Sequence, residues 1–198
     1  ESMMIAPISK MSQTIIHHIK IETQLGAMAA CATVHGICSL EFTDQKIIKI
    51  PGRLSDGFNM VESSNPHIEQ LQTELAEYFA GTRKSFAVPI HLMGTPFQEQ
   101  VWNVLMGIPY GATTTYMEQT AKLGNPKSIR AVASANGKNP IAILIPCHRV
   151  IGKNGDLTGY AGGLARKKWL LDHERLHSGL PVQLTFMTGF DSVFPADN

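Results

Sequence analysis

The sequence has few cysteines, no long apolar run and no segment typical of a secretion signal. Its 198 residues include 3 cysteines, an odd number and too few for a disulfide framework. No run approaches the roughly 18 consecutive apolar residues of a membrane span, and no apolar stretch with a basic flank precedes the first cysteine. We therefore expect a reduced intracellular protein, in the cytoplasm or the nucleus, without a membrane partner. Glu1-Ser2 precede Met3-Met4, and we expect the natural chain to begin at one of these methionines.

The chain as a whole also has no marked excess of positive or negative charge. Lys and Arg number 17 against 16 Asp and Glu, and a net charge of +1 does not indicate a nucleic-acid or membrane partner. Locally the balance differs, because residues 122–168 hold nine basic residues and a single acid, Asp156. This stretch is a candidate surface for phosphate groups, and a solvated face of a globular protein is the alternative. The nine are Lys122, Lys127, Arg130, Lys138, Arg149, Lys153, Arg166, Lys167 and Lys168.

Hydrophobic residues make up 43% of the chain, which is enough for a buried core and excludes disorder as a description of the whole. The β-branched and small apolar residues of 15–43 predict strands joined by tight turns, as an antiparallel hairpin or meander. Apolar side chains at helical spacing predict a helix over 68–79, ended by Gly81, and a connector over 82–94. Residues 1–90 are therefore expected to form an N-terminal α+β domain, a small antiparallel sheet with one helix.

From Thr95 onward the apolar period changes from two to about 3.6, which predicts a mainly helical second domain over 91–177. Thr95-Pro96-Phe97-Gln98 and Thr115-Tyr116-Met117-Glu118 each have the pattern of a helix N-terminus. Asn125-Pro126 begins a further helix, which we expect to end before Gly137. Two short helices across this turn predict a helix-turn-helix, a pair that also occurs in proteins that do not bind DNA. Residues 178–198 form a C-terminal extension.

The second helix of this pair carries mostly small residues, with Arg130 and Lys138 as the long cations beside them. The small residues are Ala131, Ala133, Ser134, Ala135 and Gly137. Small side chains let a backbone come close to another surface. Packing against a neighbouring helix explains the alanines equally well, but it does not explain Arg130.

A short apolar run between Pro140 and Pro146 predicts a buried strand that ends at Cys147. A free cysteine is usually a small core residue, but His148 and Arg149 follow, and a core avoids both. Adjacent residues of an extended chain point to opposite sides, so we expect a water molecule to connect Cys147 with His148 unless the backbone turns sharply there. As a base, His148 needs an acceptor for its second ring nitrogen.

The last predicted helix, over 163–173 or slightly longer, offers that acceptor. Helical spacing places Leu164, Lys167, Leu171 and Glu174 on one line, with the two leucines facing inward. Glu174 can then pair with His148 and Lys167 can donate into a polar pocket, or both can lie at the edge and reach solvent. The glycine-rich loop over 155–163 is a candidate pocket wall, with an ordinary surface loop as the alternative.

These residues together resemble a known family. Pro146-Cys147-His148-Arg149-Val150, with 137–145, Gly159–Leu164 and Trp169–Glu174, closely resembles the O6-alkylguanine-DNA alkyltransferases, also called methylated-DNA–protein-cysteine methyltransferases. The resemblance is strong from Thr95 to Glu174 and loose over the first 90 residues. It implies a ribonuclease H-like N-terminal domain and a winged-helix-like C-terminal domain. It also implies DNA repair, by one irreversible transfer of an alkyl group from O6-alkylguanine, or O4-alkylthymine, in double-stranded DNA to a cysteine of a monomeric protein.

The resemblance assigns roles to residues already singled out. Cys147 is the nucleophile, His148 activates it through water, Glu174 orients His148, and Asn139 holds the turn. Tyr116 assists the departing guanine near its N3 atom, supported by Lys167. Substrate contacts fall to Val150, Tyr160 and Ala161. DNA contacts fall to Arg130, which fills the stack of a flipped base, and to Ala131, Ser134, Lys138 and Arg149.

The chemistry and the departures refine this expectation. Attack at a saturated carbon gives a thioether without a carbonyl for water to attack, so we expect one turnover and no metal or organic cofactor. Ala161 stands where some relatives have serine, which leaves only its backbone N–H for the guanine. Some members bind zinc in the N-terminal domain, but the spacing of Cys31, His35 and Cys38 does not reproduce that ligand set, and we expect no metal.

Two other functions remain open from the residues. One is a helix-turn-helix regulator with a structural Cys147, which predicts sequence-specific binding that survives thiol blocking. The other is a cysteine hydrolase or acyltransferase that uses Cys147 and His148, which predicts many turnovers on an ester or amide. Lesion-binding relatives without repair activity differ at the cysteine position, so Cys147 argues against that branch.

Overall fold

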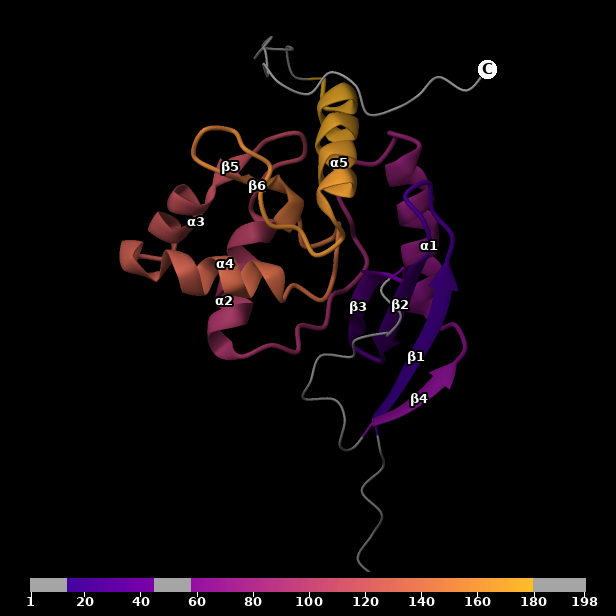
Figure 1. Ribbon diagram of the computed structural model, residues 1–198. Helices are drawn as coiled ribbons and strands as arrows, with labels where there is room; N and C mark the ends of the chain where they lie inside the picture. Colours follow the sequence, from indigo (N-terminus) through magenta and orange to yellow (C-terminus); the bar gives the residue numbers. More distant parts are fainter. Residues whose placement is uncertain (1–13, 45–57, 180–198) are drawn as a thin grey trace, which may run out of the picture.

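A computed structural model describes residues 14–44 and 58–179, in which a four-stranded sheet with one helix lies beside a group of helices (Figure 1). The sheet has the order β3-β2-β1-β4. Its strands are β1 (Thr14–Ile21), β2 (Met28–Thr33), β3 (Gly36–Phe42) and β4 (Phe58–Glu62). The structure thus has the predicted α+β class, whereas residues 1–13 and the extension beyond Gly179 lie outside the described residues.

The strands predicted over 15–43 form the antiparallel meander β1-β2-β3. The sheet as a whole is mixed, however, because β4 joins the edge at β1 in parallel. The pattern gave no sign of β4, since the strand is short and only half-buried and follows a stretch rich in glycine, serine and asparagine. One face of the sheet belongs to the main core and the other carries a small cluster of Ile16, Cys31 and Cys38.

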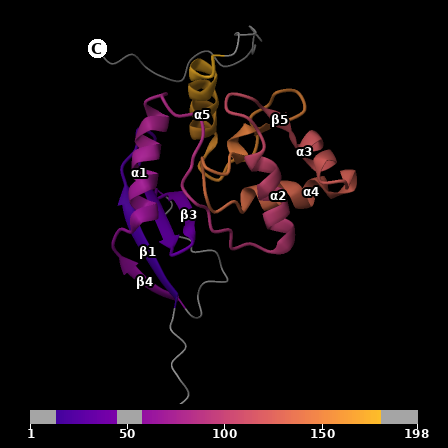
Figure 2. The same cartoon turned by 180° about the vertical axis from the view of Figure 1, so that it is seen from behind.

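Helix α1 (Pro66–Phe79) covers one face of the sheet, as Figure 2 shows from behind, and its Ile68, Leu71 and Leu75 belong to the main core. It begins two residues before the predicted start, where Asn65 Oδ1 accepts a hydrogen bond from Ile68 N at 3.0 Å. Gly81 follows the end of the helix with a φ of 76°, and a Cβ there would lie 2.2 Å from the ring of His177. The close approach explains why a glycine stands at this position.

The second part of the fold, from α2 to α5, consists of helices, turns and short strands around Cys147. They are α2 (Pro96–Met106), β5 (Thr114–Thr115), α3 (Tyr116–Lys122), the 3₁₀ turn η1 (Pro126–Ser128), α4 (Ile129–Gly137), the 3₁₀ turn η2 (Cys147–Arg149), β6 (Val150–Ile151) and α5 (Leu164–His177). Both predicted capping boxes are present, between Thr95 and Gln98 and between Thr115 and Glu118. Helices α3 and α4 form the predicted pair, with η1 occupying the first turn of the second helix.

The strand predicted between Pro140 and Pro146 is wrong. Ile141 makes a single parallel bridge with Leu40 of β3, after which the chain turns at Ile143, which has a φ of 71°. Within this turn Leu144 N donates to Ala142 O at 2.9 Å. A short apolar run between two prolines does not distinguish a buried strand from a buried turn, because both exclude polar side chains.

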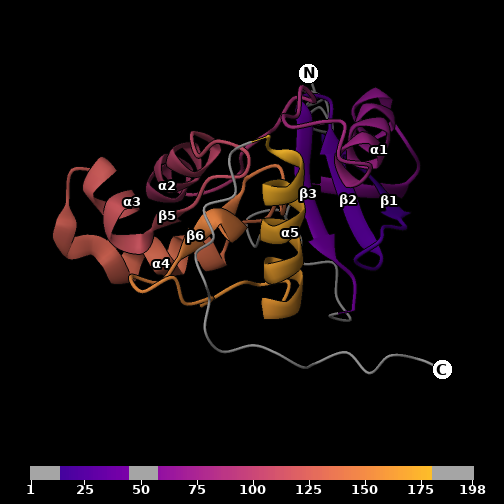
Figure 3. The same ribbon diagram turned by 90° about the horizontal axis from the view of Figure 1, so that it is seen from above.

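Helix α5 lies between the helical group and the sheet, which Figure 3 shows from above. Its buried side carries Lys167, Leu170, His173 and Glu174, whereas Leu164 is 49% exposed. The inward orientation predicted for Leu164 is therefore wrong, and Leu171 is only half-buried. The helix turns its polar residues inward because each of them has buried partners there.

Backbone and side-chain bonds join the two parts of the fold. Leu40 exchanges backbone hydrogen bonds of 2.8 Å with Pro140 O and Ala142 N, just before the cysteine turn. Arg166 of α5 donates to Leu25 O at 2.8 Å and pairs with Asp44 at 2.7 Å. The turn before Cys147 and helix α5 are thus both bonded to the part of the chain that forms the sheet. None of the helices that the structure describes is long and apolar enough to cross a membrane.

Candidate active site

The side chain of Asn139 holds the turn that carries Cys147. Its Nδ2 donates to Ile145 O at 2.7 Å and to Cys147 Sγ at 3.2 Å, and its Oδ1 accepts from Ile141 N at 3.0 Å. One amide therefore satisfies a donor and an acceptor of the buried backbone, as a neighbouring strand would do. This explains why residues 140–146 can turn, and it fixes the sulfur beside an N–H donor.

Cys147 lies at the start of η2 and its exposed fraction is 8%. Burial raises the pKa of its thiol, and the Asn139 hydrogen bond and the Lys167 charge only partly oppose this shift. The sulfur is therefore a thiol at neutral pH. Because only the thiolate is a strong nucleophile, the site needs a base to remove the proton.

His148 has one ring nitrogen bonded and the other available. Its Nε2 lies 2.8 Å from Oε1 of Glu174, whereas Nδ1 is buried without a partner among the described residues. The carboxylate requires Nε2 to be the donor, which leaves the lone pair of a neutral ring on Nδ1. Burial lowers the pKa of His148 and outweighs the opposing effect of Glu174. His148 is thus a neutral base with a fixed tautomer.

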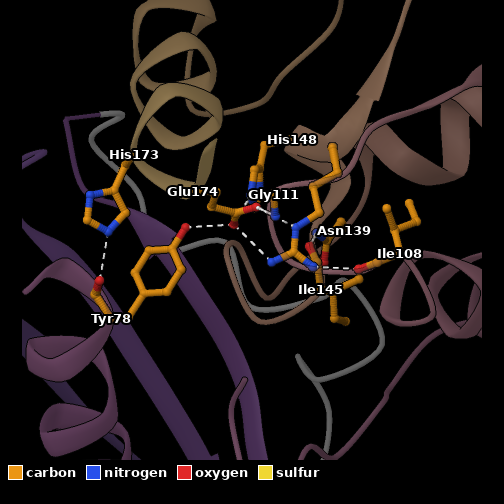
Figure 4. Close-up of polar contacts among 9 residues, drawn as sticks. Tyr78, Ile108, Gly111, Asn139, Ile145, His148, His173 and Glu174 are labelled. Atoms are coloured by element: carbon orange, nitrogen blue, oxygen red, sulfur yellow. Dashed lines mark hydrogen bonds and ion pairs between the residues drawn. The ribbon is translucent and has the colours of Figure 1, made fainter. Parts of the chain in front are cut away.

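Glu174 is fully buried and accepts five hydrogen bonds, and Figure 4 shows it with its partners Tyr78, Gly111 and His148. Oε1 accepts from Tyr78 Oη at 2.8 Å, from His148 Nε2 at 2.8 Å and from Arg149 Nη2 at 2.9 Å. Oε2 accepts from Arg149 Nε at 2.8 Å and from Gly111 N at 3.1 Å. Burial alone would raise the pKa of Glu174, but the hydrogen bonds from His148 and Arg149 and the charge of Arg149 hold it well below its usual range.

Arg149 is 7% exposed and its guanidinium is committed to the interior. Besides the two bonds to Glu174, Nη1 donates to Ile108 O at 2.6 Å. The prediction that Arg149 contacts DNA is therefore wrong for this structure. The guanidinium instead neutralises Glu174, because a buried carboxylate without a cation would carry a large desolvation penalty.

Lys167 and Tyr116 converge on the glycine-rich loop. Lys167 is fully buried and its Nζ donates to Val150 O and Thr158 O, each at 2.6 Å. Tyr116 Oη donates to the same Thr158 O at 3.3 Å. Burial lowers the pKa of Lys167 to about 8, opposed by the nearby Cys147. The alternative in which Lys167 and Glu174 reach solvent is excluded, since both are fully buried.

The three residues expected to contact substrate lie around the same centre. Val150 is fully buried, and its carbonyl accepts from Lys167. The Tyr160 ring meets the His148 ring edge-on, with the ring centroids 6.4 Å apart. Tyr160 Oη is buried and bonds to no atom of the described chain, and Ala161 is exposed on the loop beside it.

Helix α4 turns its small residues outward. Arg130, Ala131, Ser134 and Lys138 are exposed, and so are Ala133 and Gly137. On the opposite side Val132, Ala135 and Asn136 are buried, and Trp102 Nε1 donates to Ala135 O at 2.9 Å. Packing against a neighbouring helix therefore explains Ala135 but not the exposed small residues, which leave a smooth surface flanked by two cations.

Only some of the nine basic side chains in the stretch 122–168 lie on the surface. Arg149 and Lys167 are buried, and Arg166 lies over the Phe42 ring at 4.2 Å from its centroid while it pairs with Asp44. The remaining six side chains are exposed, namely Lys122, Lys127, Arg130, Lys138, Lys153 and Lys168. A count of charges in the sequence thus overstates the cations that can meet phosphates.

Sequence patterns did not identify three partners of the site. Tyr78 comes from α1, Gly111 from the loop after α2, and Gln119 from α3, where it pairs with Asn136 of α4. Each bonds to a partner more than 15 positions away in the chain, and no pattern in the sequence pointed to that partner. Within the described ranges, no three His, Cys, Asp or Glu side chains gather in a way that could hold a metal ion.

Comparisons with known proteins match both parts of the chain. Residues 16–92 match the profile of the 6-O-methylguanine DNA methyltransferase, ribonuclease-like domain, and residues 96–176 match that of the 6-O-methylguanine DNA methyltransferase, DNA binding domain. A methylated-DNA–protein-cysteine methyltransferase of Salmonella typhimurium is 43% identical over 162 residues, covering 78% of this chain and 93% of that protein. A constitutive one of Bacillus subtilis is 47% identical over 119 residues, covering 60% and 72%.

Solved structures of the same kind of protein are also similar to this chain. The crystal structure of a Mycobacterium tuberculosis O6-methylguanine methyltransferase has a TM-score of 0.70 and 38% identity, covering 86% of this chain and 98% of that one. A structure described as Mycobacterium tuberculosis OGT in complex with DNA has a TM-score of 0.70 and 36% identity, covering 82% and 94%. Both the sequence and the architecture are therefore similar to these proteins over most of their length.

Proposed function

The chain belongs to the 6-O-methylguanine DNA methyltransferase family, and we propose from this premise that Cys147 is the residue to which it transfers the alkyl group. The protein repairs DNA by alkyl transfer to a cysteine. One observation carries the choice of residue: Cys147 lies beside the buried pair of His148 and Glu174, on a turn that Asn139 holds. The other two cysteines, Cys31 and Cys38, are buried in the sheet, where burial raises their pKa values to about 12 and about 11.

The transfer begins with a proton. A water molecule between the thiol of Cys147 and Nδ1 of His148 passes the thiol proton to the ring, and Glu174 stabilises the imidazolium that forms. The thiolate then attacks the alkyl carbon on O6 of guanine. The S–C bond forms, the C–O6 bond breaks, and its electron pair stays on the base. The unpartnered Nδ1 of His148 supports this route.

The leaving guanine needs a proton, and Tyr116 is placed to supply it. Burial raises the pKa of the Tyr116 phenol, so the group keeps its proton until negative charge develops on the base. Donation to guanine N3 leaves a phenolate, which the ammonium of Lys167, bonded to the same Thr158 carbonyl, stabilises. The chain, the DNA and one water molecule account for every bond and proton in this scheme, so we propose that no metal or organic cofactor takes part.

The product fixes the stoichiometry. A thioether has no carbonyl that water can attack, so the alkyl group stays on Cys147 and each protein acts once. O4-alkylthymine presents the same kind of C–O bond, and we include it among the substrates. The hydrolase alternative requires a labile acyl thioester, which the attack on a saturated carbon does not form.

DNA is the partner, and α4 is the element that we propose to approach it. The exposed small residues let the helix enter the minor groove of double-stranded DNA, where Arg130 fills the stack left by a flipped base. Ala131, Ser134 and Lys138 lie on the same exposed side. The exposed cations of the stretch 122–168 contact phosphates without reading sequence. We propose that one monomer serves one lesion.

The experiment uses duplex DNA that carries radiolabelled O6-methylguanine. We expect one label per protein molecule, bound covalently, and none on Cys147→Ala. Many turnovers would favour the hydrolase, and sequence-specific binding without transfer would favour the regulator. Label on the Cys147→Ala protein would show that another residue accepts the alkyl group.

A further inference from the structure

Tyr78 of α1 is bonded to two consecutive residues of α5. Its phenol donates to Glu174 Oε1 at 2.8 Å, and its backbone carbonyl accepts from His173 Nε2 at 2.7 Å (Figure 4). The side chain is fully buried. A residue from the ribonuclease-like part of the chain therefore reaches the carboxylate that orients the base of the other part.

The phenol and the imidazole share one oxygen atom. Oε1 of Glu174 accepts from Tyr78 and His148 at the same distance of 2.8 Å, and Arg149 adds a third bond at 2.9 Å. Each donor draws negative charge toward itself, so the carboxylate has less charge to offer any one of them. The bond from Tyr78 therefore weakens the hold of Glu174 on the His148 proton.

We propose that Tyr78 is a positioning residue that sets the basicity of His148, and with it the pH at which Cys147 becomes reactive, through the shared Oε1 of Glu174. This inference rests on the proposed function of the site. The carboxylate keeps its place without the phenol, because Arg149 holds both oxygens and Gly111 N holds Oε2. Loss of the hydroxyl therefore changes the charge on Oε1 more than it changes geometry.

The sign of the effect follows from the charges. Glu174 stabilises the imidazolium that forms when His148 takes the proton of Cys147, and an additional donor on Oε1 reduces this stabilisation. Removal of the phenol makes the thiolate–imidazolium pair more favourable, so its apparent pKa falls. Burial and the Glu174 charge raise the pKa of Tyr78 well above its usual value, and the phenol therefore keeps its proton and donates at neutral pH.

Other titratable groups also face the carboxylate and the ring. They are Tyr110 in the loop after α2, Cys147 and Arg149 in η2, Tyr160 in the glycine-rich loop, and Lys167 and His173 in α5. Tyr110 provides a matched control. Its ring lies 6.0 Å from the Tyr78 ring, and its hydroxyl is buried without a partner among the described residues. Tyr110→Phe therefore removes a buried phenol oxygen beside the site without removing a hydrogen bond.

The test is the pH dependence of the single-turnover rate of methyl transfer from duplex DNA, measured for the natural protein, Tyr78→Phe and Tyr110→Phe. We expect the half-maximal pH of Tyr78→Phe to fall by at least about half a unit, with the Tyr110→Phe profile unchanged. A Tyr78→Phe profile that superimposes on that of the natural protein, or an equal shift in Tyr110→Phe, overturns the proposal. If the natural protein transfers no label, the proposed function fails instead.

A second variant protects the test against a folding defect in Tyr78→Phe. A tyrosine fluorinated on its ring, placed at position 78, keeps the shape and the backbone bond to His173 but donates more strongly. Its profile is expected to move to higher pH, opposite to Tyr78→Phe. A shift in the same direction for both variants contradicts a role through the shared oxygen.

Discussion

Gln119 of α3 and Asn136 of α4 form a reciprocal pair of buried amide hydrogen bonds. Gln119 Nε2 donates to Asn136 Oδ1 at 2.9 Å, and Asn136 Nδ2 donates to Gln119 Oε1 at 2.7 Å. The two side chains are 0% and 6% exposed. The pair joins the two helices of the helix-turn-helix and so fixes how α4 presents its outer side.

Gln119→Leu leaves the Asn136 amide buried without its partner. We expect a loss of about 1 to 3 kcal/mol in the free energy of unfolding, measured by urea denaturation. The double variant Gln119→Leu, Asn136→Leu is expected to lose less than the sum of the single changes, because it leaves no orphaned amide. Additive losses would show that the two side chains do not act as a pair.

Arg149→Met tests whether this residue belongs to the interior. It leaves the Glu174 carboxylate buried without its guanidinium, so we expect a loss of about 3 to 5 kcal/mol in unfolding free energy. Lys153→Met, at an exposed position nearby, is the control and is expected to leave stability unchanged. If Arg149→Met instead binds DNA more weakly and its stability is unchanged, Arg149 belongs to the surface that contacts DNA.

Arg130→Ala is expected to slow methyl transfer from double-stranded DNA on the order of tenfold or more, since flipping a base costs a few kcal/mol of unstacking that the arginine offsets. Transfer from single-stranded DNA is expected to change little, because there the base is not stacked in a duplex. Lys138→Ala is the comparison and is expected mainly to reduce the salt dependence of binding. Equal losses on both substrates for Arg130→Ala would argue against a role in flipping.

Stability is expected to fall below about pH 6.5. The pKa of His148 is lowered in the folded protein by burial, so the unfolded chain takes up a proton first as the pH falls. Glu174 adds to the loss below about pH 4.3, because its folded pKa is also depressed. Unfolding free energies from pH 7 to pH 4 test this, and His148→Gln is expected to give a flatter curve between pH 6.5 and 5. An equal slope in the variant would assign the acid loss to other groups.

Local patterns in the sequence predicted the parts of the fold that depend on local chemistry. Thr95 and Thr115 begin helices because a threonine and a glutamine or glutamate three residues later cap the backbone within one turn. The pairing of His148 with Glu174 was predicted because a base needs an acceptor and one helix offered it. Both predictions rest on the need of a polar group for a hydrogen-bond partner, a backbone N–H at the helix ends and a ring nitrogen at His148.

The predictions that were wrong concern residues whose conformation depends on partners elsewhere in the chain. The chain turns at Ile143 because the Asn139 side chain makes the backbone hydrogen bonds that a neighbouring strand would otherwise make. The spacing of apolar residues gives no sign of such side-chain bonds. Leu164 faces outward because buried partners draw Lys167 and Glu174 inward against their polarity. Arg149 was expected to contact DNA, whereas its partners are Glu174 and a carbonyl 41 residues away.

Glu174 lies in the last helix that the structure describes, 27 positions after Cys147, the residue that we propose accepts the alkyl group. A growing chain releases Cys147 from the ribosome before it releases the acid, and at about 5 to 20 residues per second the interval lasts seconds. Throughout this interval His148 lacks the carboxylate that accepts its Nε2 proton. Under the proposed function, Cys147 therefore becomes reactive only after α5, the last helix that the structure describes, has been made.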